Sequence, residues 1–517
     1  MAPSKKTLSS ELFKACSESR FPPSENPKRF LPHGKLDQIV TRESVIRELD
    51  WDQDDDALID FILKDAKTLF AISLMSRIPD LRPTMELFMK HNICDRDLPL
   101  PISRDQVSKD LGECFEFVED MDLDLFINKQ QWMFLAPVFG VGPASAIEIG
   151  QRSFPQGVIF PFVKTEEIID GGFGIVYKVE IHKSHLHGSP DDPILKDNCK
   201  AAIKELRLQI NMDETDSKAY KVWKRETAAL EMISHFRNPH IIEAQAIMSR
   251  GGKQYIMFPW ADGGNLWDFW SRNPSPILTV DFIRDIVEQL AGLADALKLL
   301  HDYNWRHGDL KPENILVFTP EERQGVWKMA DLALTKFNKV STQQRLYTTT
   351  INGTISYEPP DVLNRVGPRS RLYDIWSMGC IILQLVIWLL RGLDTCTEFM
   401  RSIFDPQKGT SSFWVQMSEP RVHPMVTRMM DGISEHLENV TKSPAIEALL
   451  NIVRNQLLVV QLPSRANAAA FHSALKEIQQ KGEANRAYWL TGPINSEDAP
   501  KPEAHSLMVS QVEARVL

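Results

Sequence analysis

This sequence of 517 residues has few cysteines, no long apolar run and no excess of positive charge. Its six cysteines lie far apart and form no C-x-x-C pair, which excludes the common zinc and redox spacings and favours a reducing compartment. The longest apolar stretch, 378–390, is shorter than the roughly 20 residues that span a membrane, so we expect a buried helix and no membrane association. The amino terminus lacks the apolar core of a secretory signal, and we therefore expect a cytoplasmic or nuclear protein.

The overall charge is mildly acidic. Lys and Arg number 59 and Asp and Glu number 69, which gives a net charge of −10. A protein that binds nucleic acid by neutralising phosphates needs the opposite excess, so no nucleic-acid partner is expected. With 43% apolar and 25% charged residues the chain is typical of soluble globular proteins, and its length predicts two to four domains.

Changes in sequence pattern divide the chain into five parts. Ser, Lys and Pro are frequent at the start, apolar residues then recur at helical spacing, notably at 59–70, and a polar stretch precedes the alternation that is typical of strands. Amphipathic helical patterns follow, and the last part is polar with no period. We predict a mobile arm (1–30), a mainly helical region of unknown role (31–140), a linker (141–158), a domain of sheet followed by helices (159–481) and a disordered tail (482–517).

Two clusters suggest metal sites but have simpler explanations. The acidic run at 50–56 precedes a helical pattern, where negative charge favours the positive end of the helix dipole, and it lacks the Gly and terminal Glu of a calcium loop. His182, His185 and His187 lie in a polar insertion with no fourth ligand in view, so we favour a solvated loop over a zinc site.

A glycine-rich turn lies between two strand patterns near the start of the fourth part. Gly171, Gly172 and Gly174 allow a hairpin backbone to lie close over phosphate groups, because glycine has no Cβ in the way. Val176, just beyond the turn, can pack on a flat base. A flexible hairpin without a ligand is the alternative that this short pattern leaves open.

The next strand pattern carries a lysine. Alternation along the strand puts Lys204 on the same face as Ala202, pointing inward, where a buried ammonium requires an anionic partner. Glu226, in the helical pattern that follows, is the predicted partner. The alternative is a lone lysine whose ammonium reaches water.

The segment 307–314 combines several groups that phosphoryl transfer requires. Asp309 can accept a hydroxyl proton, and Asn314, five residues later, can bind a metal ion. The positive charge of Lys311 suits it to offset negative charge on the transferring phosphoryl group. Asp331, at the end of a later strand pattern, would complete a magnesium site together with Asn314 and nucleotide phosphates. A merely polar loop leaves this combination unexplained.

These segments follow the order of the motifs of the eukaryotic protein kinase family, which the chain resembles over about residues 160–480. The later segments 353–361 and 374–379 extend the resemblance. It implies an α+β fold of two lobes, a small antiparallel sheet (the N-lobe, about 159–262) and a helical C-lobe (about 263–481), preceded by the helical region. It also implies ATP and Mg²⁺ as cofactors and protein serine or threonine hydroxyls as substrates.

The resemblance assigns a role to each candidate residue. Lys204 would hold the α- and β-phosphates, Glu226 would orient that lysine, and Asp309 would be the catalytic base. Lys311 together with Thr354 is similar to the hydroxyl-positioning pair of serine/threonine kinases. Magnesium would bind Asn314 and Asp331, and the nucleotide would lie among Gly171, Gly172, Gly174, Val176, Ala202, Phe258, Pro259 and Ala261, with Phe258 as gatekeeper and Pro259 and Ala261 in the hinge.

A closer resemblance concerns the chain as a whole. The segments IHKSHLH, HGDLKPENIL and PWADGGNLWDFW, with the helical region before them, are similar to large uncharacterised filamentous-fungal kinases. The helical region would then pack on the kinase domain or bind a regulatory partner. A structural ion pair is also predicted, because Asp361 replaces the Glu of the APE motif with its charge retained, and Arg465 is its expected buried partner.

Four further positions depart from the family pattern. Ile169 stands at the first glycine, Leu332 and Ala333 replace the Phe and Gly of the DFG motif, and Gly308 replaces the arginine before Asp309. Without that arginine, the basic pocket for a phosphorylated activation segment lacks its main member, so loop phosphorylation is expected to be unnecessary. The departures motivate a rival hypothesis, a pseudokinase that acts as a nucleotide-binding scaffold or signalling module.

Overall fold

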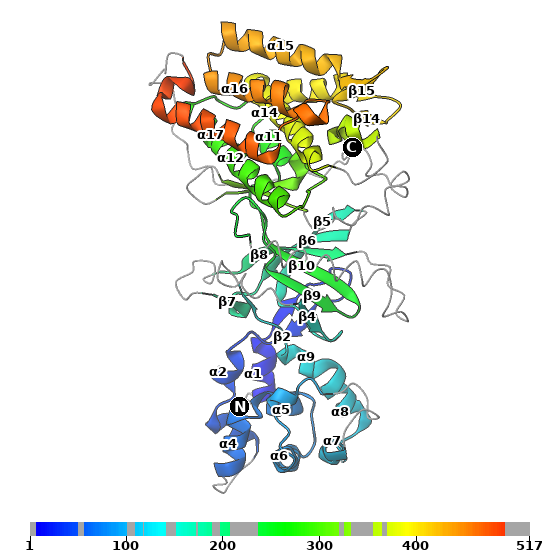
Figure 1. Cartoon of the computed structure of the whole chain (residues 1–517). Helices are drawn as coiled ribbons and strands as arrows, with labels where there is room; N and C mark the ends of the chain where they lie inside the picture. The colour runs from blue at the N-terminus through cyan, green and yellow to red at the C-terminus, as the bar shows by residue number, and fades with distance from the viewer. Residues whose placement is uncertain are drawn as a thin grey trace.

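Three parts follow one another along the molecule in this computed structural model. A helical region, a sheet lobe and a helical lobe are stacked from the bottom to the top of Figure 1. The structure describes residues 7–49, 56–100, 109–116, 118–140, 151–171, 174–188, 197–206, 236–319, 325–331, 355–363 and 370–491. The predicted α+β architecture, with a sheet-rich N-lobe and a helical C-lobe behind a helical region, is confirmed.

The helical region packs around a core of its own, in which Phe70 and Phe88 are fully buried. The apolar spacing at 59–70 is divided between two helices, because the Asp95 carboxylate accepts hydrogen bonds from the N–H groups of Thr68 and Leu69 (2.8 and 2.9 Å) and so caps the start of a new helix. Of the acidic run, residue 56 begins a helix and residues 50–55 lie outside the described residues. The helices are α1 (Leu8–Ala15), α2 (Lys35–Ile39), α3 (Arg42–Glu48), α4 (Asp56–Lys64), α5 (Lys67–Met75), α6 (Leu81–Lys90), α7 (Lys109–Cys114), α8 (Asp120–Leu125) and α9 (Gln131–Phe134).

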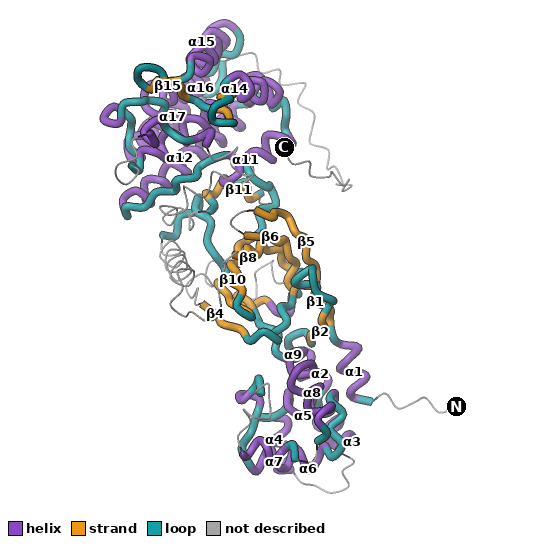
Figure 2. The backbone as a smooth tube through the Cα atoms, turned by 90° about the vertical axis from the view of Figure 1, so that its right-hand side faces the viewer, coloured by secondary structure: helices purple, strands orange, loops and turns teal. Residues whose placement is uncertain are grey.

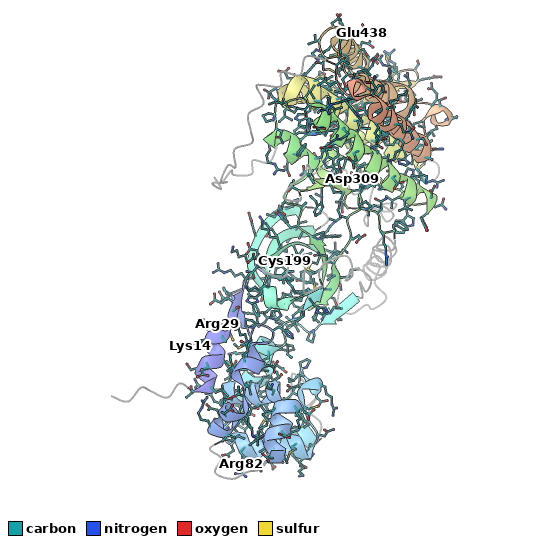
Figure 3. All side chains as sticks on the ribbon, turned by 90° about the vertical axis from the view of Figure 1, so that its left-hand side faces the viewer. Lys14, Arg29, Arg82, Cys199, Asp309 and Glu438 are labelled. Carbon is teal, nitrogen blue, oxygen red and sulfur yellow. The ribbon has the colours of Figure 1, made fainter. Side chains whose placement is uncertain are left out.

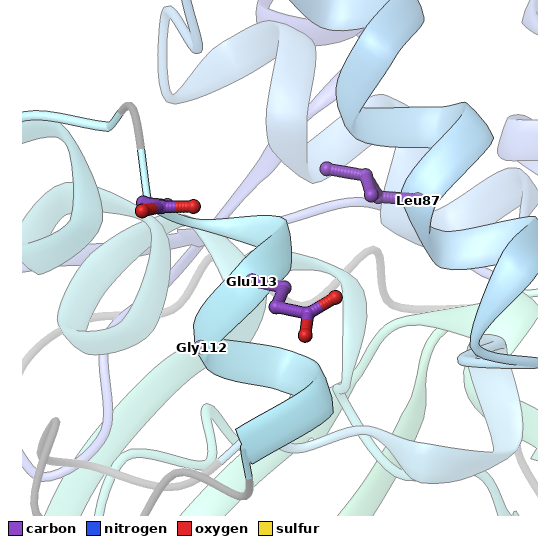
Figure 4. A pocket seen from close by; sticks show the side chains of 4 residues that line it. Leu87, Gly112 and Glu113 are labelled. Atoms are coloured by element: carbon purple, nitrogen blue, oxygen red, sulfur yellow. The ribbon is translucent and has the colours of Figure 1, made fainter.

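A pocket of about 530 Å³ lies between α6 and α7 (Figure 4). Leu87, Gly112, Glu113 and Glu116 line it, and Glu113 is also paired with the imidazole of His91 at 3.0 Å. The pocket belongs to the helical region, and the whole N-lobe separates that region from the C-lobe (Figures 1 and 3). The pocket is therefore separate from the site residues predicted from the sequence, which lie in the N-lobe and the C-lobe.

Residues 7–30 do not form the mobile arm that their composition predicts. After α1 they build two short antiparallel strands, β1 (Ser17–Ser19) and β2 (Lys28–Phe30). Phe21 and Phe30 are 4% and 0% exposed, and both belong to the core beneath the N-lobe sheet. Burying an aromatic side chain stabilises by roughly 1.5–3 kcal/mol, which offsets the ordering of a short polar segment. Residues 1–6 lie outside the described residues.

The N-lobe is built on a sheet of six strands in the order β4-β9-β10-β8-β6-β5. Figure 1 labels β9, and Figure 2 shows the sheet from the side, with the other strands labelled. Neighbouring strands are antiparallel, as predicted, except that β4 pairs with β9 in parallel. β4 arises from the predicted linker, where its backbone satisfies the otherwise open edge of β9; residues 141–150 of that linker lie outside the described residues. The strands are β4 (Gln151–Phe154), β5 (Phe162–Gly171), β6 (Gly174–Ile181), β8 (Cys199–Leu206), β9 (Ala246–Arg250) and β10 (Lys253–Pro259), beside the parallel pair β3 (Phe139–Gly140) and β7 (Leu186–His187).

The two faces of this sheet have different neighbours. On β8, Ala201 and Ile203 are fully buried in the core that also holds Phe21. Ala202 and Lys204 alternate with them, so they lie on the opposite face, and both are half-buried. One face of the sheet thus rests on the N-terminal segment, and the other carries the predicted phosphate-binding lysine.

His185 links the segment before α2 to the N-lobe. Its Nδ1 lies 3.0 Å from the carbonyl oxygen of Pro137, and its Nε2 accepts a hydrogen bond from the N–H of His33 at 3.1 Å. Burial lowers the pKa of His185 to about 4, so the ring stays neutral near pH 7. Because both ring nitrogens are occupied, His185 is a structural residue of the core and not part of a solvated loop.

The C-lobe surrounds one long apolar helix, α14. It is the single helix in the described part of the chain that is long and apolar enough to span a membrane, and 94% of its most apolar window is buried inside the lobe. The buried helix predicted at 378–390 is thus confirmed. Gly392, with φ of 81°, divides α14 into two helical pieces. The elements are α11 (Leu266–Arg272), α12 (Val280–Asp302), β11 (Ile315–Phe318), β12 (Val326–Met329), α14 (Leu372–Ser402), β13 (Phe404–Asp405), β14 (Thr410–Ser411), β15 (Trp414–Gln416), β16 (Pro420–Val422), α15 (Pro424–Asn439), α16 (Pro444–Ile452) and α17 (Ala468–Ala484).

The predicted disordered tail begins too early at residue 482. α17 continues to Ala484, and Trp489 is 3% exposed. Its indole ring packs directly on Gly482, where an added Cβ would lie 2.1 Å from the ring. Ser443 and Lys442 add hydrogen bonds to Trp489 and Thr491, so the chain beyond α17 is ordered by both kinds of contact. Residues 492–517 lie outside the described residues.

The ion pair predicted between Asp361 and Arg465 is confirmed. The Nη2 of Arg465 lies 2.9 Å from Oδ1 of Asp361, and the arginine side chain is fully buried. The guanidinium also donates to the carbonyl oxygens of Val459 and Leu372, at 2.8 and 3.0 Å. The additional acceptors satisfy a charge that would otherwise be costly to bury.

Candidate active site

An ion pair joins the two lobes. The Nζ of Lys204, on β8, lies 2.6 Å from Oδ1 of Asp331, which follows β12 in the C-lobe. Burial alone would raise the pKa of Asp331, but the neighbouring ammonium of Lys204, with His307 and Lys311, holds it below its ordinary value. Lys204 therefore has an anionic partner, although its predicted partner Glu226 lies outside the described residues.

The loop 307–314 gathers three of the predicted side chains. Asn314 donates from Nδ2 to the carbonyl oxygen of Asp309 at 2.7 Å and to its Oδ2 at 3.1 Å. The Nζ of Lys311 lies 3.6 Å from the same Oδ2. Figure 3 shows Asp309 at the edge of the C-lobe that faces the sheet. The Asp309 carboxylate is thus held in place by two neighbours on the side of the C-lobe that faces the sheet.

Asn314 and Asp331 lie at the same end of the β11–β12 hairpin. Ile315 pairs with Met329, and the N–H of Ala330 donates to the carbonyl oxygen of Asn314 at 2.9 Å. Since Asn314 turns its amide nitrogen toward Asp309, its amide oxygen is directed away from that residue. A carboxylate and an amide oxygen are hard oxygen donors of the kind that Mg²⁺ prefers, so this pair fits the predicted metal.

Asp374 anchors the loop, a role that the sequence analysis did not assign. This fully buried carboxylate accepts hydrogen bonds from the N–H groups of His307 and Gly308, at 2.9 and 2.7 Å, and contacts Nε2 of His301 at 2.9 Å. Nε2 of His307 in turn lies 2.8 Å from the carbonyl oxygen of Ala330. The network connects α14, the loop and the residue before Asp331. A lone Asp in an apolar helical pattern is the signal that could have indicated it.

Two residues in the site have left-handed backbone conformations. Gly308 has φ of 76°, which glycine adopts without strain, so the residue that replaces the usual arginine also fits its backbone. Asp331 has φ of 65°, a region in which Asp is one of the few tolerated side chains. The loop geometry therefore depends on both residue types.

Val176, Ala202 and Phe258, three of the nucleotide-site candidates, lie on the face of the sheet that carries Lys204. Val176 pairs across the ladder with Lys204, and Ala202 pairs with Phe258. Phe258 packs partly buried against Leu206, Ala244, Ile247 and Ile256, the residues that line this face. Pro259 ends β10 and Ala261 follows at 8% exposure, in the connection to the C-lobe.

The glycine turn closes the β5–β6 hairpin. Gly171 pairs with Gly174, and Ile169 pairs with Val176, which puts Ile169 on the same face as Lys204 at 56% exposure. Gly174 has φ of 150°, and an added Cβ would lie 2.1 Å from the carbonyl oxygen of Glu205 on β8. Its lack of a side chain is therefore required by close backbone packing, whether or not a phosphate binds.

Gly174→Ala is accordingly expected to destabilise the N-lobe. A left-handed backbone and a clash with a carbonyl each contribute about 1–3 kcal/mol. Thermal unfolding of the full chain measures the loss. The matched control is Gly112→Ala, a helical glycine with nothing within 4 Å of an added Cβ, which should be neutral or stabilising by up to about 1 kcal/mol. Equal unfolding temperatures for the two variants would contradict this account of the turn.

Several predicted positions lie outside the described residues: Gly172, Glu226, Leu332, Ala333 and Thr354. The site is therefore described through Lys204, Asp309, Lys311, Asn314 and Asp331, which the structure brings together. Their assigned roles remain predictions.

The motifs and this geometry coincide with one protein family. A model of the protein kinase domain matches residues 163–429, slightly more than half of the chain. The chain belongs to the protein kinase family. The matched range contains every site residue predicted from the sequence.

Serine/threonine kinases are among the relatives of this protein kinase. It is 31% identical over 209 residues to CBL-interacting protein kinase 5 of Oryza sativa subsp. japonica, covering 40% of this chain and 41% of the relative. It is 30% identical over 225 residues to CBL-interacting serine/threonine-protein kinase 15 of Arabidopsis thaliana, covering 44% and 46%. The chain thus spans less than half the length of these relatives. Both are plant proteins, and the resemblance to filamentous-fungal kinases stays a prediction.

Proposed function

We propose that this protein transfers the γ-phosphoryl group of ATP, in a magnesium-dependent reaction, to serine or threonine hydroxyls of protein substrates. The observation that carries the proposal is the ion pair between Lys204 of the N-lobe and Asp331 of the C-lobe, together with Asn314, which contacts both Asp309 and the residue before Asp331. Family membership and the names of the serine/threonine kinase relatives support the same reaction.

The residues of the chain contribute by position and charge. ATP supplies the phosphoryl group, and bound Mg²⁺ offsets the negative charge of its phosphates. Lys204 would bind phosphate oxygens from the sheet side, and Asn314 and Asp331 would provide oxygen ligands for the metal. Asp309 orients the acceptor hydroxyl and accepts its proton, while Lys311, 3.6 Å from that carboxylate, offsets charge on the transferring group.

A transfer assay with labelled ATP tests the proposal. Wild type is expected to label dephosphorylated casein or myelin basic protein, and Asp309→Asn is expected to lose about 10²–10⁴-fold of the rate, the usual contribution of a general base. The neutral amide keeps the shape of the side chain and the hydrogen bond from Asn314. Equal incorporation by both proteins would instead favour the pseudokinase hypothesis that Ile169, Gly308, Leu332 and Ala333 motivate.

The helical region is proposed to act as a regulatory part of the kinase. It has its own core but reaches the N-lobe through Phe21, Phe30 and Trp132, which are buried in the sheet core. A partner that binds the helical region could therefore influence the strand that carries Lys204. A pull-down with the helical region as bait, compared with the full chain, would identify such a partner.

A further inference from the structure

The helical region carries the whole net charge of the protein. Residues 31–140 contain 12 Lys and Arg but 22 Asp and Glu, and this excess equals the net charge of −10 of the full chain. In the rest of the sequence Lys and Arg equal Asp and Glu in number. A field of one sign attracts partners of the opposite charge and repels a second copy of the same region.

Many of these acidic residues lie beside the pocket between α6 and α7. The stretch 113–124 runs from α7 into α8 and has six acidic side chains but no Lys, Arg or His. Four of the six are exposed to solvent. A cation that approaches this end of the molecule is therefore attracted toward the pocket. The acidic residues are Glu113, Glu116, Glu119, Asp120, Asp122 and Asp124.

The two carboxylates that line the pocket have different surroundings. Glu113 lies 3.0 Å from Nε2 of His91 and 3.6 Å from Nζ of Lys90, at the end of α6, so its position is fixed by neighbours. Glu116 is exposed and forms no ion pair within the part of the chain that the structure describes. The charge of Glu116 is therefore free to bind a cationic group in the pocket.

The pocket also has an apolar wall and open space. Leu87 lines it from α6, and Gly112 lines it from α7 (Figure 4). A Cβ added to Gly112 would meet nothing within 4 Å. The volume of about 530 Å³ is in the range of ligand pockets, roughly 300–1,000 Å³. An arginine side chain matches this combination, because it joins an apolar stem to a planar cation that pairs well with carboxylates.

Other classes of ligand match the pocket less well. Among the described residues, no group of three His, Cys, Asp or Glu side chains is arranged to hold a metal ion. Nucleotides and nucleic acids carry phosphate charges of the same sign as Glu116. A second copy of the helical region carries the same acidic excess. A basic polypeptide is the class of partner that the charge favours.

A continuous helical stretch connects this surface to the N-lobe. α8, a π-helical turn (Phe126–Gln130) and α9 follow one another without a break. Within α9, Met133 belongs to the core of the helical region, whereas Trp132 is buried in the core of the N-lobe sheet. The Trp132 ring packs on Gly157, where an added Cβ would lie 2.1 Å away. A partner bound beside α8 would thus contact an element that ends inside the N-lobe.

We propose that the pocket between α6 and α7 binds an arginine side chain from a basic, amphipathic segment of a partner protein. The guanidinium pairs with Glu116, and the apolar stem lies along Leu87. The inference rests on the regulatory role proposed above for the helical region and gives that role a partner of stated chemistry. It does not depend on phosphoryl transfer.

Binding of a labelled peptide to the full chain tests the proposal. The probe is a fluorescein-labelled amphipathic peptide with arginine on one face and leucine on the other, and fluorescence anisotropy gives its Kd. Replacing its arginines by citrulline keeps their shape and removes their charge, which is expected to weaken binding at least about tenfold. Glu116→Lys should weaken binding of the arginine peptide by a similar factor, because like charges repel. Equal affinity for the two peptides, or no binding to wild type, would overturn the proposal.

Two control variants separate the pocket from the overall charge. Glu438→Lys makes the same charge change at an exposed position at the opposite end of the molecule (Figure 3), and it should change the Kd less than about twofold. Gly112→Leu fills the pocket without a charge change and should weaken binding at least about tenfold, whereas Gly112→Ala should not. Equal losses in Glu116→Lys and Glu438→Lys, or an unchanged Kd in Gly112→Leu, would show attraction by net charge only and overturn the site.

The same variants keep folding and catalysis apart from binding. Melting temperatures show whether each variant folds, and Gly112→Leu should not lower them, since leucine is a better helix former than glycine. The titration contains neither ATP nor a protein acceptor. A wild-type protein that binds the peptide but phosphorylates nothing would refute the transfer reaction alone, and an active kinase that does not bind it would refute this inference alone.

Discussion

Asp331→Asn is expected to reduce phosphoryl transfer by about 10²–10³-fold, because stabilisation by a bound metal is worth several kcal/mol and each 1.36 kcal/mol is a factor of ten. The amide keeps the size of the side chain and one oxygen, but it loses the charge that would attract Mg²⁺. It also removes the anionic partner of Lys204, whose Nζ lies 2.6 Å from the carboxylate.

Comparison with Lys204→Met separates the loss of the predicted metal ligand from the loss of the ion pair. Both variants break the ion pair, but only Asp331→Asn alters the predicted metal ligands. In Asp331→Asn the magnesium concentration for half-maximal rate should therefore rise, and excess Mg²⁺ should restore part of the activity. In Lys204→Met the rate should fall while its magnesium dependence stays near that of wild type.

An Asp→Asn change outside the site provides the control. Asp302, at the end of α12, is 59% exposed and pairs with Lys298 at 3.4 Å. Exposed pairs of this kind contribute at most about 1 kcal/mol, so Asp302→Asn should retain nearly full activity. Full activity in Asp331→Asn, or the same magnesium dependence in Asp331→Asn and Lys204→Met, would contradict the metal role assigned to Asp331.

The part of the site that could be predicted from the sequence depends on local spacing. Asp309 and Asn314 are five residues apart in one loop, and Lys204 and Ala202 share a face by strand alternation, so short-range geometry was sufficient. The pairing of Asp361 with Arg465 was reached through the family resemblance, because 104 residues separate them and no local pattern connects them.

The features that sequence reasoning missed all depend on long-range packing. Asp374 has its role because α14 passes beneath the 307–314 loop, which no spacing in the sequence reveals. Phe21 occurs in a polar, proline-containing segment whose composition favours disorder, and its burial depends on a pocket formed by strands far along the chain.

Phe21 is the site of the second substitution with a large expected effect, which is a loss of N-lobe stability. Its ring is 4% exposed and meets the rings of Phe162 and Tyr177 at 5.3 Å and of Tyr255 at 5.6 Å, all edge-on. The guanidinium of Arg250 lies 5.6 Å from the same ring. Edge-to-face rings add about 0.5–1.5 kcal/mol per pair beyond the area that they bury. The anchor therefore completes the core behind the strands that carry Val176 and Lys204.

Phe21→Ala in the full chain is expected to destabilise the N-lobe by about 3–5 kcal/mol, the usual range for a buried Phe→Ala change that leaves a cavity. Thermal unfolding should detect an earlier transition, and hydrogen exchange should report faster opening of β6 and β8 than of α12 or α14. Phe13→Ala is the matched control, because that ring is 49% exposed. Its main contact, the Arg29 guanidinium at 4.2 Å, contributes about 0.5–1 kcal/mol at an exposed site, so the loss should stay within about 1 kcal/mol.

The same packing predicts that a protein truncated to begin at Gly150 does not form a stable N-lobe. The truncation removes Phe21, Phe30, Trp132 and Phe139, which together fill the core on one face of the sheet. That face would then expose Tyr177, Ile203 and other apolar side chains to water. A contiguous exposed apolar patch promotes aggregation. If the truncated protein instead unfolds at the wild-type temperature and retains its transfer activity, the N-terminal segment is a dispensable cover and not part of the kinase core.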